Sequence, residues 1–421
     1  MPYGKKNLKV SLSDSFCISI IKPSFVPAIP KPRTAIRKAL KTPINSPALS
    51  ELIQPDDRVG IVFSDITRPV PNWLILPEIL AEIGYVPKQN ILLFNALGTH
   101  RKNSQQELRY MLGDWIVDNY RIIQNDSSDQ STQMYLGKTC FGHDILINRE
   151  LLNCDIKILT GFIEPHFFAG FSGGAKTLMP GMAGSNTIFG NHNAKMIAHP
   201  KATWLVTEGN PIFEEIREIG DKVENLFLLN VTQNINKGIT GVFSGEVREA
   251  HARGCNFVKE IAMVPVQSPF DIVITTNSGY PLDINLYQSV KGMSAAAKVV
   301  KRGGAIVMAA ACQDGIPDHG LYGNLLRSNA TPGDLLESIM SSPEVKQDQW
   351  QAQIQALIQQ KADVYLFSDG LSEDQISSAL LKPVKNLEAC VEFLVNKLGP
   401  DAKIGILIEG PQTVPYIIDE A

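Results

Sequence analysis

The stretch VGIVFSDITRPVP, residues 59–71, decides the fold class of this chain. Its first part, from Val59 to Phe63, is apolar without alternation, and Asp65 and Arg68 follow in a turn that contains two prolines. An apolar run of this kind predicts a strand buried on both faces, as in a parallel sheet covered by helices. The same pattern recurs, with helical stretches between, at residues 91–99, 156–161 and 226–231. We therefore expect an α/β fold.

A second series of such runs begins at Asp271 and indicates a second α/β unit. The runs lie at residues 272–277, 304–308, 364–369 and 404–410. Two prolines and a serine within residues 263–270 precede this series, so we place a domain boundary there. The prediction is an N-terminal α/β domain at residues 1–265 and a C-terminal α/β domain at residues 266–421. We expect two mainly parallel, Rossmann-like sheets with an active site in the interdomain cleft.

The composition excludes several classes of protein. The 421 residues are 44% hydrophobic and 19% charged, and the net charge of −4 is spread without long runs of one sign, which argues against nucleic acid as a partner. No apolar run approaches the ~20 residues of a membrane-spanning helix, and no export signal is visible. The six cysteines form no Cys-x-x-Cys pair, which favours reduced thiols. We expect a cytoplasmic protein with neither nucleic acid nor a membrane as partner.

Two predicted strands end in polar side chains suited to a small ligand. Asp65, Thr67 and Arg68 follow the first strand, and the guanidinium fork of an arginine matches a carboxylate or phosphate. The alternative is that Asp65 caps the next helix while Arg68 points into solvent. His100 follows the second strand in the turn Gly98-Thr-His-Arg, where an imidazole would either meet a ligand or serve the structure.

The densest polar segment runs from Glu164 through His166 and a glycine-rich loop to His192. Its loop reads Gly170-Phe-Ser172-Gly173-Gly174-Ala-Lys176, and glycines allow a backbone to approach a ligand closely. The spacing is not that of the Walker phosphate-binding motif. Three roles are open to a lysine on such a loop: a solvated charge, a counter-ion of a phosphate, or, if it is desolvated, an amine nucleophile.

A fourth segment, residues 277–297, is predicted to form a strand end, a turn and the start of a helix. Gln288 and Lys291 stand three positions apart and so share one helix face, next to Tyr287. Together these side chains would reach a substrate carboxylate. The alternative is the polar surface of an alanine-rich helix.

Taken together, these motifs resemble the nickel-dependent lactate racemase family, whose members racemise or epimerise 2-hydroxy acids. Ten positions separate His166 from Lys176 and sixteen separate Lys176 from His192, as in the family pattern. The resemblance is carried by segments spread over most of the chain: Asp65-x-Thr67-Arg68-Pro69, Gly98-Thr99-His100-Arg101, residues 165–192, residues 279–292 and Trp350.

The resemblance implies a nickel pincer nucleotide, pyridinium-3,5-bisthiocarboxylic acid mononucleotide nickel, that is covalently bound through Lys176. His192 would be the protein ligand of the Ni(II), which favours a planar site with soft sulfur and imidazole donors. Other proteins would have to build this cofactor. The ribose and phosphate are assigned to a further set of residues, namely Asp65, Thr67, Ser172, Gly173 and Gly174.

The resemblance also implies a reaction, the racemisation of a 2-hydroxy acid by hydride transfer through a 2-keto acid. His100 and His166 would exchange the hydroxyl proton on opposite sides of the substrate, and each would change protonation near neutral pH. Substrate binding is assigned to Arg68, Tyr287, Gln288, Lys291 and Trp350. The remaining histidines are expected to be structural or to lie at the protein surface: His143, His199, His251 and His319.

Two other functions stay open. In a glycine-rich-loop phosphotransferase, Lys176 would only bind phosphate, ATP would bind without nickel, and His192→Ala would cost little. A non-catalytic carrier of the nickel cofactor would bind nickel but turn over no hydroxy acid. The presence of both His100 and His166 favours catalysis, because a carrier needs neither.

Overall fold

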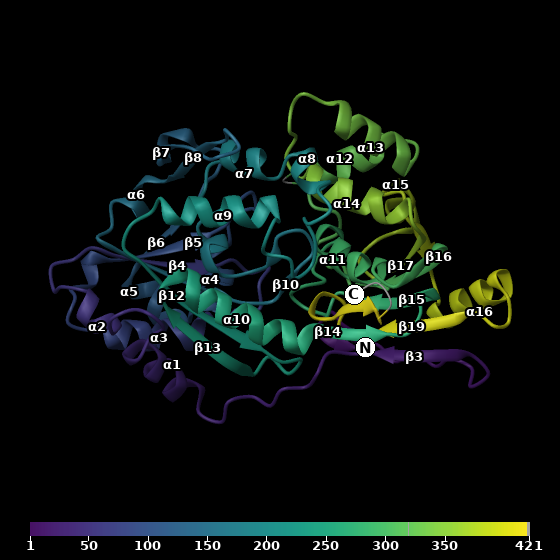
Figure 1. Ribbon diagram of the computed structural model, residues 1–421, viewed down its shortest axis with the longest axis horizontal. Coiled ribbons are helices and arrows are strands. Elements are labelled where there is room, and N and C mark those ends of the chain that lie inside the picture. Colours follow the sequence, from purple (N-terminus) through teal and green to yellow (C-terminus); the bar gives the residue numbers. More distant parts are fainter. Residues whose placement is uncertain (319, 419–421) are drawn as a thin grey trace.

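Two six-stranded sheets form the centre of the computed structural model, which describes residues 1–318 and 320–418 (Figure 1). The first sheet has the order β13-β12-β9-β4-β5-β6, and only β13 is antiparallel to its neighbour. Its strands are β4 (Val59–Ser64), β5 (Ile91–Ala96), β6 (Arg121–Gln124), β9 (Ile156–Phe162), β12 (Leu226–Gln233) and β13 (Ile239–Gly245). The four strands predicted for this part of the chain are all present.

The second sheet has the order β18-β17-β16-β15-β19-β3 and is parallel throughout. Its strands are β3 (Cys17–Ile21), β15 (Phe270–Thr276), β16 (Val300–Ala309), β17 (Asp363–Phe367), β18 (Lys382–Val384) and β19 (Lys403–Leu407). The predicted mainly parallel α/β fold is thus confirmed. Strand β3, close to the N-terminus, pairs with β19 of the C-terminal half (Figure 1), which the sequence analysis did not anticipate.

Helices on both sides of the first sheet explain why its strands do not alternate between apolar and polar residues. Ile61 and Phe63 of β4 are buried in one core with α1 (Pro32–Lys41) and α3 (Asn72–Glu82), while Val62 packs into the core on the opposite face. The side chains on both faces of the strand are therefore buried, and the burial of each aliphatic side chain contributes about 1.5–3 kcal/mol to the stability of the fold.

The second sheet is covered in the same way. Ile272 and Ile274 of β15 share a core with α16 (Leu387–Leu398), whereas Val273 between them belongs to the core that includes α11 (Leu286–Ala297). That core also contains residues of the first half, so the two halves share buried surface.

The chain passes between the halves after β3 and again after α10 (Val247–Ala262). Directly after α10, β14 (Met263–Val266) pairs with β20 (Val414–Ile417) beside the second sheet. The predicted domain boundary falls within β14. Because β3 belongs to the second sheet, a single cut in the sequence does not separate the strands of the two sheets.

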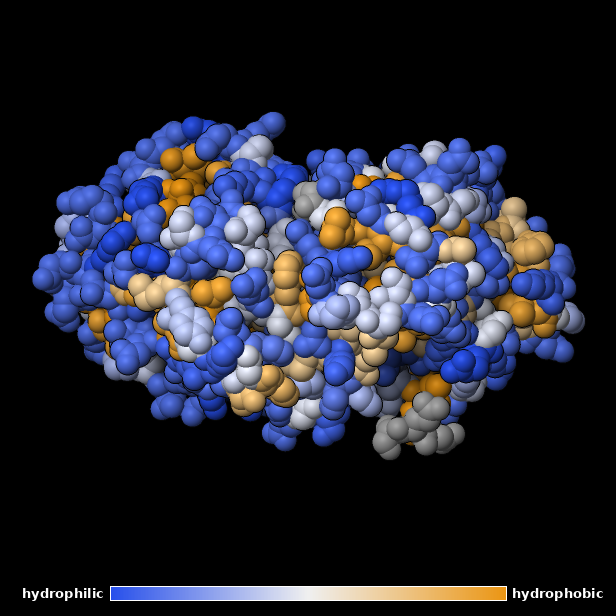
Figure 2. All heavy atoms as spheres, turned by 90° about the horizontal axis from the view of Figure 1, so that it is seen from above, coloured by the Kyte–Doolittle hydropathy of each residue, from blue (hydrophilic) through white to orange (hydrophobic). Residues whose placement is uncertain are grey.

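The remaining strands are short: β1 (Pro2–Tyr3), β2 (Lys6–Asn7), β7 (Gln133–Lys138), β8 (Asp144–Asn148), β10 (Pro165–His166) and β11 (Gly170–Phe171). The remaining helices are α2 (Leu49–Leu52), α4 (Gln105–Leu112), α5 (Asp114–Asn119), α6 (Arg149–Leu152), α7 (Ser185–Asn191), α8 (Ala194–Ile197), α9 (Pro211–Asp221), α12 (Tyr322–Arg327), α13 (Pro332–Ser341), α14 (Gln349–Gln359) and α15 (Glu373–Ser378). Four 3-10 turns complete the described part of the fold: η1 (Lys88–Asn90), η2 (Gln130–Thr132), η3 (Gly174–Thr177) and η4 (Gly410–Gln412). Figure 2 shows a face covered mainly by hydrophilic side chains, with hydrophobic ones in small separate groups. Within the described residues, no helix is both long and apolar enough to cross a membrane.

Candidate active site

A cavity lies where the carboxyl ends of β4, β5 and β9 face α11 and α14, so both halves of the chain line it. This is the expected place for a ligand in an open parallel sheet. All residues that the sequence analysis assigned to the site line this cavity, except Thr67 and Gly174. They come from positions 65 to 350, and the fold alone brings them together.

The loops after β4 and β5 form the first wall of the cavity. The N–H of Arg68 donates to the carbonyl of Asp65 at 3.1 Å, which closes a turn directly after β4. After β5, Gly98 adopts a φ of +57° and its N–H donates to the carbonyl of Gly181 at 3.0 Å. This bond ties the turn that carries His100 to the segment following the glycine-rich loop.

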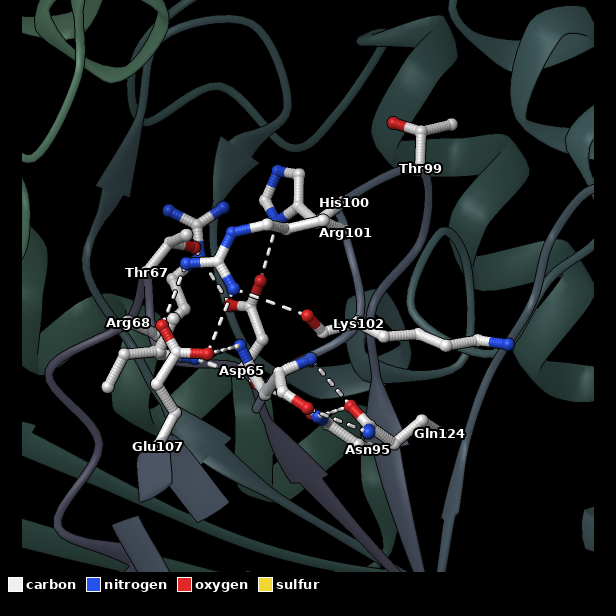
Figure 3. A network of polar contacts seen from close by, with 12 residues as sticks. Asp65, Thr67, Arg68, Asn95, Thr99, His100, Arg101, Lys102, Glu107 and Gln124 are labelled. Atoms are coloured by element: carbon white, nitrogen blue, oxygen red, sulfur yellow. Dashed lines mark hydrogen bonds and ion pairs between the residues drawn. The ribbon is translucent and has the colours of Figure 1, made fainter. Parts of the chain in front are cut away.

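His100 is paired with a buried carboxylate (Figure 3). Its Nδ1 lies 2.6 Å from Oδ2 of Asp65, and the hydroxyl of Thr67 donates to Oδ1 of the same carboxylate at 2.8 Å. Burial raises the pKa of Asp65, but His100, Arg68 and Thr67 outweigh burial and hold that pKa below its ordinary value. Asp65 is therefore ionised, and both of its oxygens have protein partners. Thr67 reaches the site only through Asp65.

His166 lies in the tight hairpin of β10 and β11, where it is 3% exposed. The backbone N–H of Ala169 donates to its Nδ1 at 3.2 Å, and the rings of Phe167 and Phe168 lie 4.9 Å and 4.5 Å away. Burial, followed by the positive charges of Lys176 and Lys291, holds the pKa of His166 well below its ordinary value. The imidazole is therefore neutral in the free protein.

The glycine-rich loop is fixed by contacts with the protein. The hydroxyl of Ser172 accepts from the N–H of Glu164 at 2.9 Å and donates to the carbonyl of Phe162 at 3.0 Å. Gly173 has a φ of +79°, and a Cβ there would lie 2.4 Å from Oδ1 of Asn230, which also accepts from the N–H of Gly174 at 2.8 Å. These glycines let the loop pack closely, and the result is a defined position for Lys176.

Lys176, in η3, projects an amine into the cavity. Burial, with a smaller contribution from Arg68, lowers the pKa of Lys176 to about 7. The ammonium lies 5.7 Å from the ring centroid of Phe168. Near neutral pH a large fraction of this amine is uncharged, and an uncharged amine is nucleophilic.

His192 directly follows α7 and is 3% exposed. The rings of Phe168 and Trp350 meet it edge-on with centroids at 5.1 Å, and its Nδ1 is buried without a hydrogen-bond partner. Burial holds its pKa well below the ordinary value, so the ring is neutral. A neutral imidazole with a free nitrogen suits a metal ion such as Ni(II). No group of three or more His, Cys, Asp or Glu residues within the described chain could hold a metal ion, so other donors would have to come from a bound molecule.

Arg68 and Lys291 provide buried nitrogen donors for an anion. Nη1 of Arg68 and Nζ of Lys291 are both buried without hydrogen-bond partners, as is Oε1 of Gln288 on the same face of α11. Burial, followed by the charge of Arg68, holds the pKa of Lys291 well below its ordinary value. Leaving buried donors unpaired is costly, so this arrangement favours a bound anion such as a carboxylate or phosphate.

Side chains of the C-terminal half close the cavity. Nε1 of Trp350 donates to the hydroxyl of Tyr287 at 2.8 Å, and burial holds the pKa of Tyr287 well above its ordinary value, so this hydroxyl stays protonated. Nε2 of Gln347 donates to the carbonyl of Thr99 at 3.2 Å, across the two halves. The loop before α14 is thus attached to the turn that carries His100.

Two carboxylates near the site were not assigned from the sequence. Glu164 is 4% exposed; its Oε1 lies 3.9 Å from Nη1 of Arg68 and its Oε2 accepts from Gln412 at 3.2 Å. Asp348 is 3% exposed, and burial raises its pKa to about 6. Their closeness in sequence to His166 and to Trp350, two positions away in each case, is the signal that could have found them.

The other described histidines do not line the cavity. Nδ1 of His143 lies 2.7 Å from Oε1 of the buried Glu215, and Nε2 of His251 lies 2.8 Å from the carbonyl of Ser172. His199 is exposed. His319 lies outside the described residues.

The chain is similar to known proteins over most of its length. The family model described as the lactate racemase N-terminal domain matches residues 3–205, and that described as the lactate racemase C-terminal domain matches residues 266–414. A lactate racemase from Thermoanaerobacterium thermosaccharolyticum is 35% identical over 419 residues, with 98% of each chain covered. One from Lactiplantibacillus plantarum is 38% identical over 378 residues, with 89% of each chain covered.

Solved structures show the same fold. The structure of the lactate racemase apoprotein from Thermoanaerobacterium thermosaccharolyticum superposes with a TM-score of 0.90 at 34% identity and covers 99% of both chains. A protein from Thermotoga maritima superposes with a TM-score of 0.72 at 17% identity, covering 91% of this chain and 98% of that one, and this second likeness concerns the fold alone.

Proposed function

This chain belongs to the lactate racemase family, and from that premise we propose that it is an isomerase that interconverts the two enantiomers of a small 2-hydroxy acid, with lactate as the first substrate to test. The observation that carries the proposal is the composition of one cavity wall. Two imidazoles, His100 and His166, line the same cavity as the guanidinium of Arg68 and the amines of Lys176 and Lys291.

The cations fit the substrate's charge. A 2-hydroxy acid is a carboxylate at neutral pH, and Arg68 and Lys291 offer buried nitrogen donors that have no hydrogen-bond partner within the described residues. Gln288 adds an unpaired carbonyl oxygen that would accept a hydrogen bond from the substrate's hydroxyl. Charge-assisted hydrogen bonds of this kind contribute about 1.5–3 kcal/mol each.

The imidazoles fit the substrate's hydroxyl. Inversion at Cα requires that the stereocentre become planar, and removing Cα–H as a proton would place negative charge beside the existing carboxylate. Removing it as a hydride instead makes the hydroxyl proton acidic, and a nearby imidazole takes that proton. When the product forms on the opposite face, an imidazole on that side returns a proton. His100 and His166 are the two residues proposed for these transfers.

The residues present fit a nickel pincer nucleotide. The neutral, unpartnered His192 would bind the metal, the partly uncharged amine of Lys176 would form the covalent attachment, and the loop at Ser172–Gly174 would lie against the nucleotide. When bound, this group supplies a hydride acceptor and donor, which the side chains of the chain themselves lack. Trp350 and Tyr287, joined by a hydrogen bond, would exclude water from the oxidised substrate.

The same proposal includes the partners of the protein. The substrate is a small molecule, and the cofactor must be made and delivered by other proteins. The protein is proposed to act in the cytoplasm, where thiols stay reduced.

The first experiment measures attachment and metal. The chain is co-expressed with proteins that build the nickel pincer nucleotide, and its intact mass, the mass of the Lys176 peptide and its nickel content are determined. We expect a mass increment on that peptide and near-stoichiometric nickel. ATP binding without nickel, with His192→Ala binding ATP as well as the wild type, would instead identify a phosphotransferase.

The second experiment measures turnover. Single-enantiomer lactate carrying deuterium at Cα is incubated with the cofactor-loaded protein. The products are separated by chiral chromatography, and their masses are determined by mass spectrometry. We expect the opposite enantiomer with its deuterium retained. Nickel without turnover of any hydroxy acid would identify a carrier, and loss of deuterium to solvent at every turnover would exclude hydride transfer. His199→Ala, at an exposed position, serves as the matched control for substitutions at His100 and His166.

A further inference from the structure

The two histidines of the cavity have Nδ1 neighbours of opposite kind. Nδ1 of His100 lies 2.6 Å from a carboxylate oxygen of Asp65, whereas Nδ1 of His166 lies 3.2 Å from the backbone nitrogen of Ala169. A neutral imidazole carries its proton on one of its two nitrogens. The neighbour of Nδ1 therefore decides what Nε2 offers to a ligand.

The neighbour of His100 can only accept. Asp65 is 3% exposed, and its other oxygen already accepts from the hydroxyl of Thr67 at 2.8 Å. Its pKa lies below the ordinary value, so the carboxylate is ionised and offers no proton to share. The hydrogen atom in the His100–Asp65 bond must then sit on Nδ1, and in the neutral ring Nε2 of His100 is left with a lone pair.

The neighbour of His166 can only donate. A backbone N–H has no lone pair, so Nδ1 of His166 must be unprotonated to accept from Ala169, and a neutral ring then carries its proton on Nε2. Protonation of both nitrogens is opposed first by burial of the ring, which lowers the pKa of His166, and then by Lys176, Lys291, Arg68 and His192, which face the ring from η3, α11, the loop after β4 and the end of α7.

Packing prevents His166 from turning over. The rings of Phe167 and Phe168 hold it at 4.9 Å and 4.5 Å, and a turned ring would set a C–H against the N–H of Ala169. That would leave a buried backbone donor without an acceptor. The turn itself is fixed, because Gly170 has a φ of +72° and a Cβ there would lie 2.3 Å from the carbonyl of Val206.

We infer that the two histidines rest in opposite tautomers, so that His100 presents a hydrogen-bond acceptor at Nε2 and His166 presents a hydrogen-bond donor at Nε2 before substrate binds. Asp65 and the amide of Ala169 are the positioning groups that set this difference. The tautomers are a property of the chain; their consequence for turnover rests on the proposed function.

That consequence is an unequal pair of reactions. A substrate whose hydroxyl faces His100 meets a base that is ready. One whose hydroxyl faces His166 meets an N–H, and Nε2 of that ring can accept the substrate's proton only after its own proton has moved to Nδ1 and the hydrogen bond from Ala169 is broken. Two enantiomers have equal free energy, so their kcat/KM values must be equal for a racemase. The difference therefore appears in kcat and KM separately, with the lower kcat accompanied by a proportionally lower KM.

The first test reads the tautomers directly and needs no cofactor. The full-length chain is labelled with 15N-histidine, and the ring nitrogens are observed by long-range 1H–15N correlation at pH 7, with assignments from His100→Gln and His166→Gln. We expect a protonated Nδ1 for His100 and a protonated Nε2 for His166. The same tautomer in both rings, or a doubly protonated His166, would overturn the inference.

Two variants separate positioning from folding. Asp65→Ala removes the acceptor, and we expect the His100 signals to move toward the other tautomer while those of His166 stay unchanged. Thr67→Val keeps the carboxylate and removes only its second partner, so the His100 pattern should persist. If Asp65→Ala does not fold, the wild-type spectrum still tests the two tautomers. If it folds and the His100 signals are unchanged, Asp65 does not set the tautomer of His100.

The second test measures kcat and KM for both lactate enantiomers with the loaded protein. Unequal kcat values at equal kcat/KM support the inference, and equal kcat values with the expected tautomers would refute its consequence for turnover. No racemisation together with the expected tautomers would refute the proposed function and leave the tautomer assignment intact.

Discussion

Replacing Lys176 by methionine should stabilise the protein in the absence of cofactor. The pKa of Lys176 is about 7 in the folded chain against an ordinary 10.5, because burial and Arg68 disfavour its charged form. That difference corresponds to an upper bound of about 5 kcal/mol in the free energy of unfolding. Lys176 is only partly buried, and solvent screening reduces the effect, so we expect Lys176→Met to gain about 2–4 kcal/mol at pH 7.

The gain should depend on pH with a definite sign. Between pH 7 and 10.5 the unfolded chain binds a proton at this lysine that the folded chain does not, so the wild type becomes more stable as the pH rises through this window. The advantage of Lys176→Met is therefore complete below pH 7 and disappears near pH 10.5. Urea unfolding of both proteins across this range measures it, with Lys195→Met at an exposed position as the control. A gain that is absent at pH 7, or that does not shrink at high pH, would refute the assignment of a buried, unpaired amine.

Three further substitutions test the site. His192→Ala should abolish nickel retention in the co-expressed protein, measured by elemental analysis, while the exposed His199→Ala keeps it; equal nickel in both would remove His192 as a ligand. Trp350→Phe loses one hydrogen bond, and we expect KM to rise about fivefold in the racemase assay, corresponding to about 1 kcal/mol; an unchanged KM would place Trp350 outside substrate binding. Gly173→Ala places a Cβ 2.4 Å from a buried oxygen at a φ of +79°, so we expect a loss of about 2–4 kcal/mol in urea unfolding, against about 1 kcal/mol for Gly137→Ala, which has a positive φ but open space; equal losses would show that the contact is relieved cheaply.

Local sequence was sufficient to predict eight of the twelve described strands in the two main sheets, but not β3, β6, β13 or β18. The run from Val59 to Phe63 lacks alternation because helices cover both faces of its sheet, and that reason is visible in the sequence. Polar residues directly after buried strands predict a site, because the carboxyl ends of parallel strands meet at one edge. This rule placed Asp65 and His100 at the edge where the cavity lies, whereas the site roles of all four residues, including Gln288 and Lys291 on α11, came from the family resemblance.

The partners of those side chains could not be predicted from the sequence. Asp65 was assigned to the ribose or phosphate of a cofactor, and that assignment stays a prediction; the structure gives its oxygens to His100, 35 positions away, and to Thr67. Glu164 beside Arg68 and Asp348 near Tyr287 were likewise unassigned. Each of these contacts depends on how two loops from different strands or halves are oriented, and no local pattern encodes that orientation.

The sequence by itself therefore determined the fold class, the central strands of both sheets and the kinds of side chain gathered at their ends, because burial and backbone geometry act locally. Only the tertiary structure decided that β3 joins the second sheet and that His100 and His166 face opposite kinds of hydrogen-bond partner. The physical reason is that a hydrogen bond needs its two groups within about 3 Å and correctly aligned. That condition is met by packing between segments far apart in the chain.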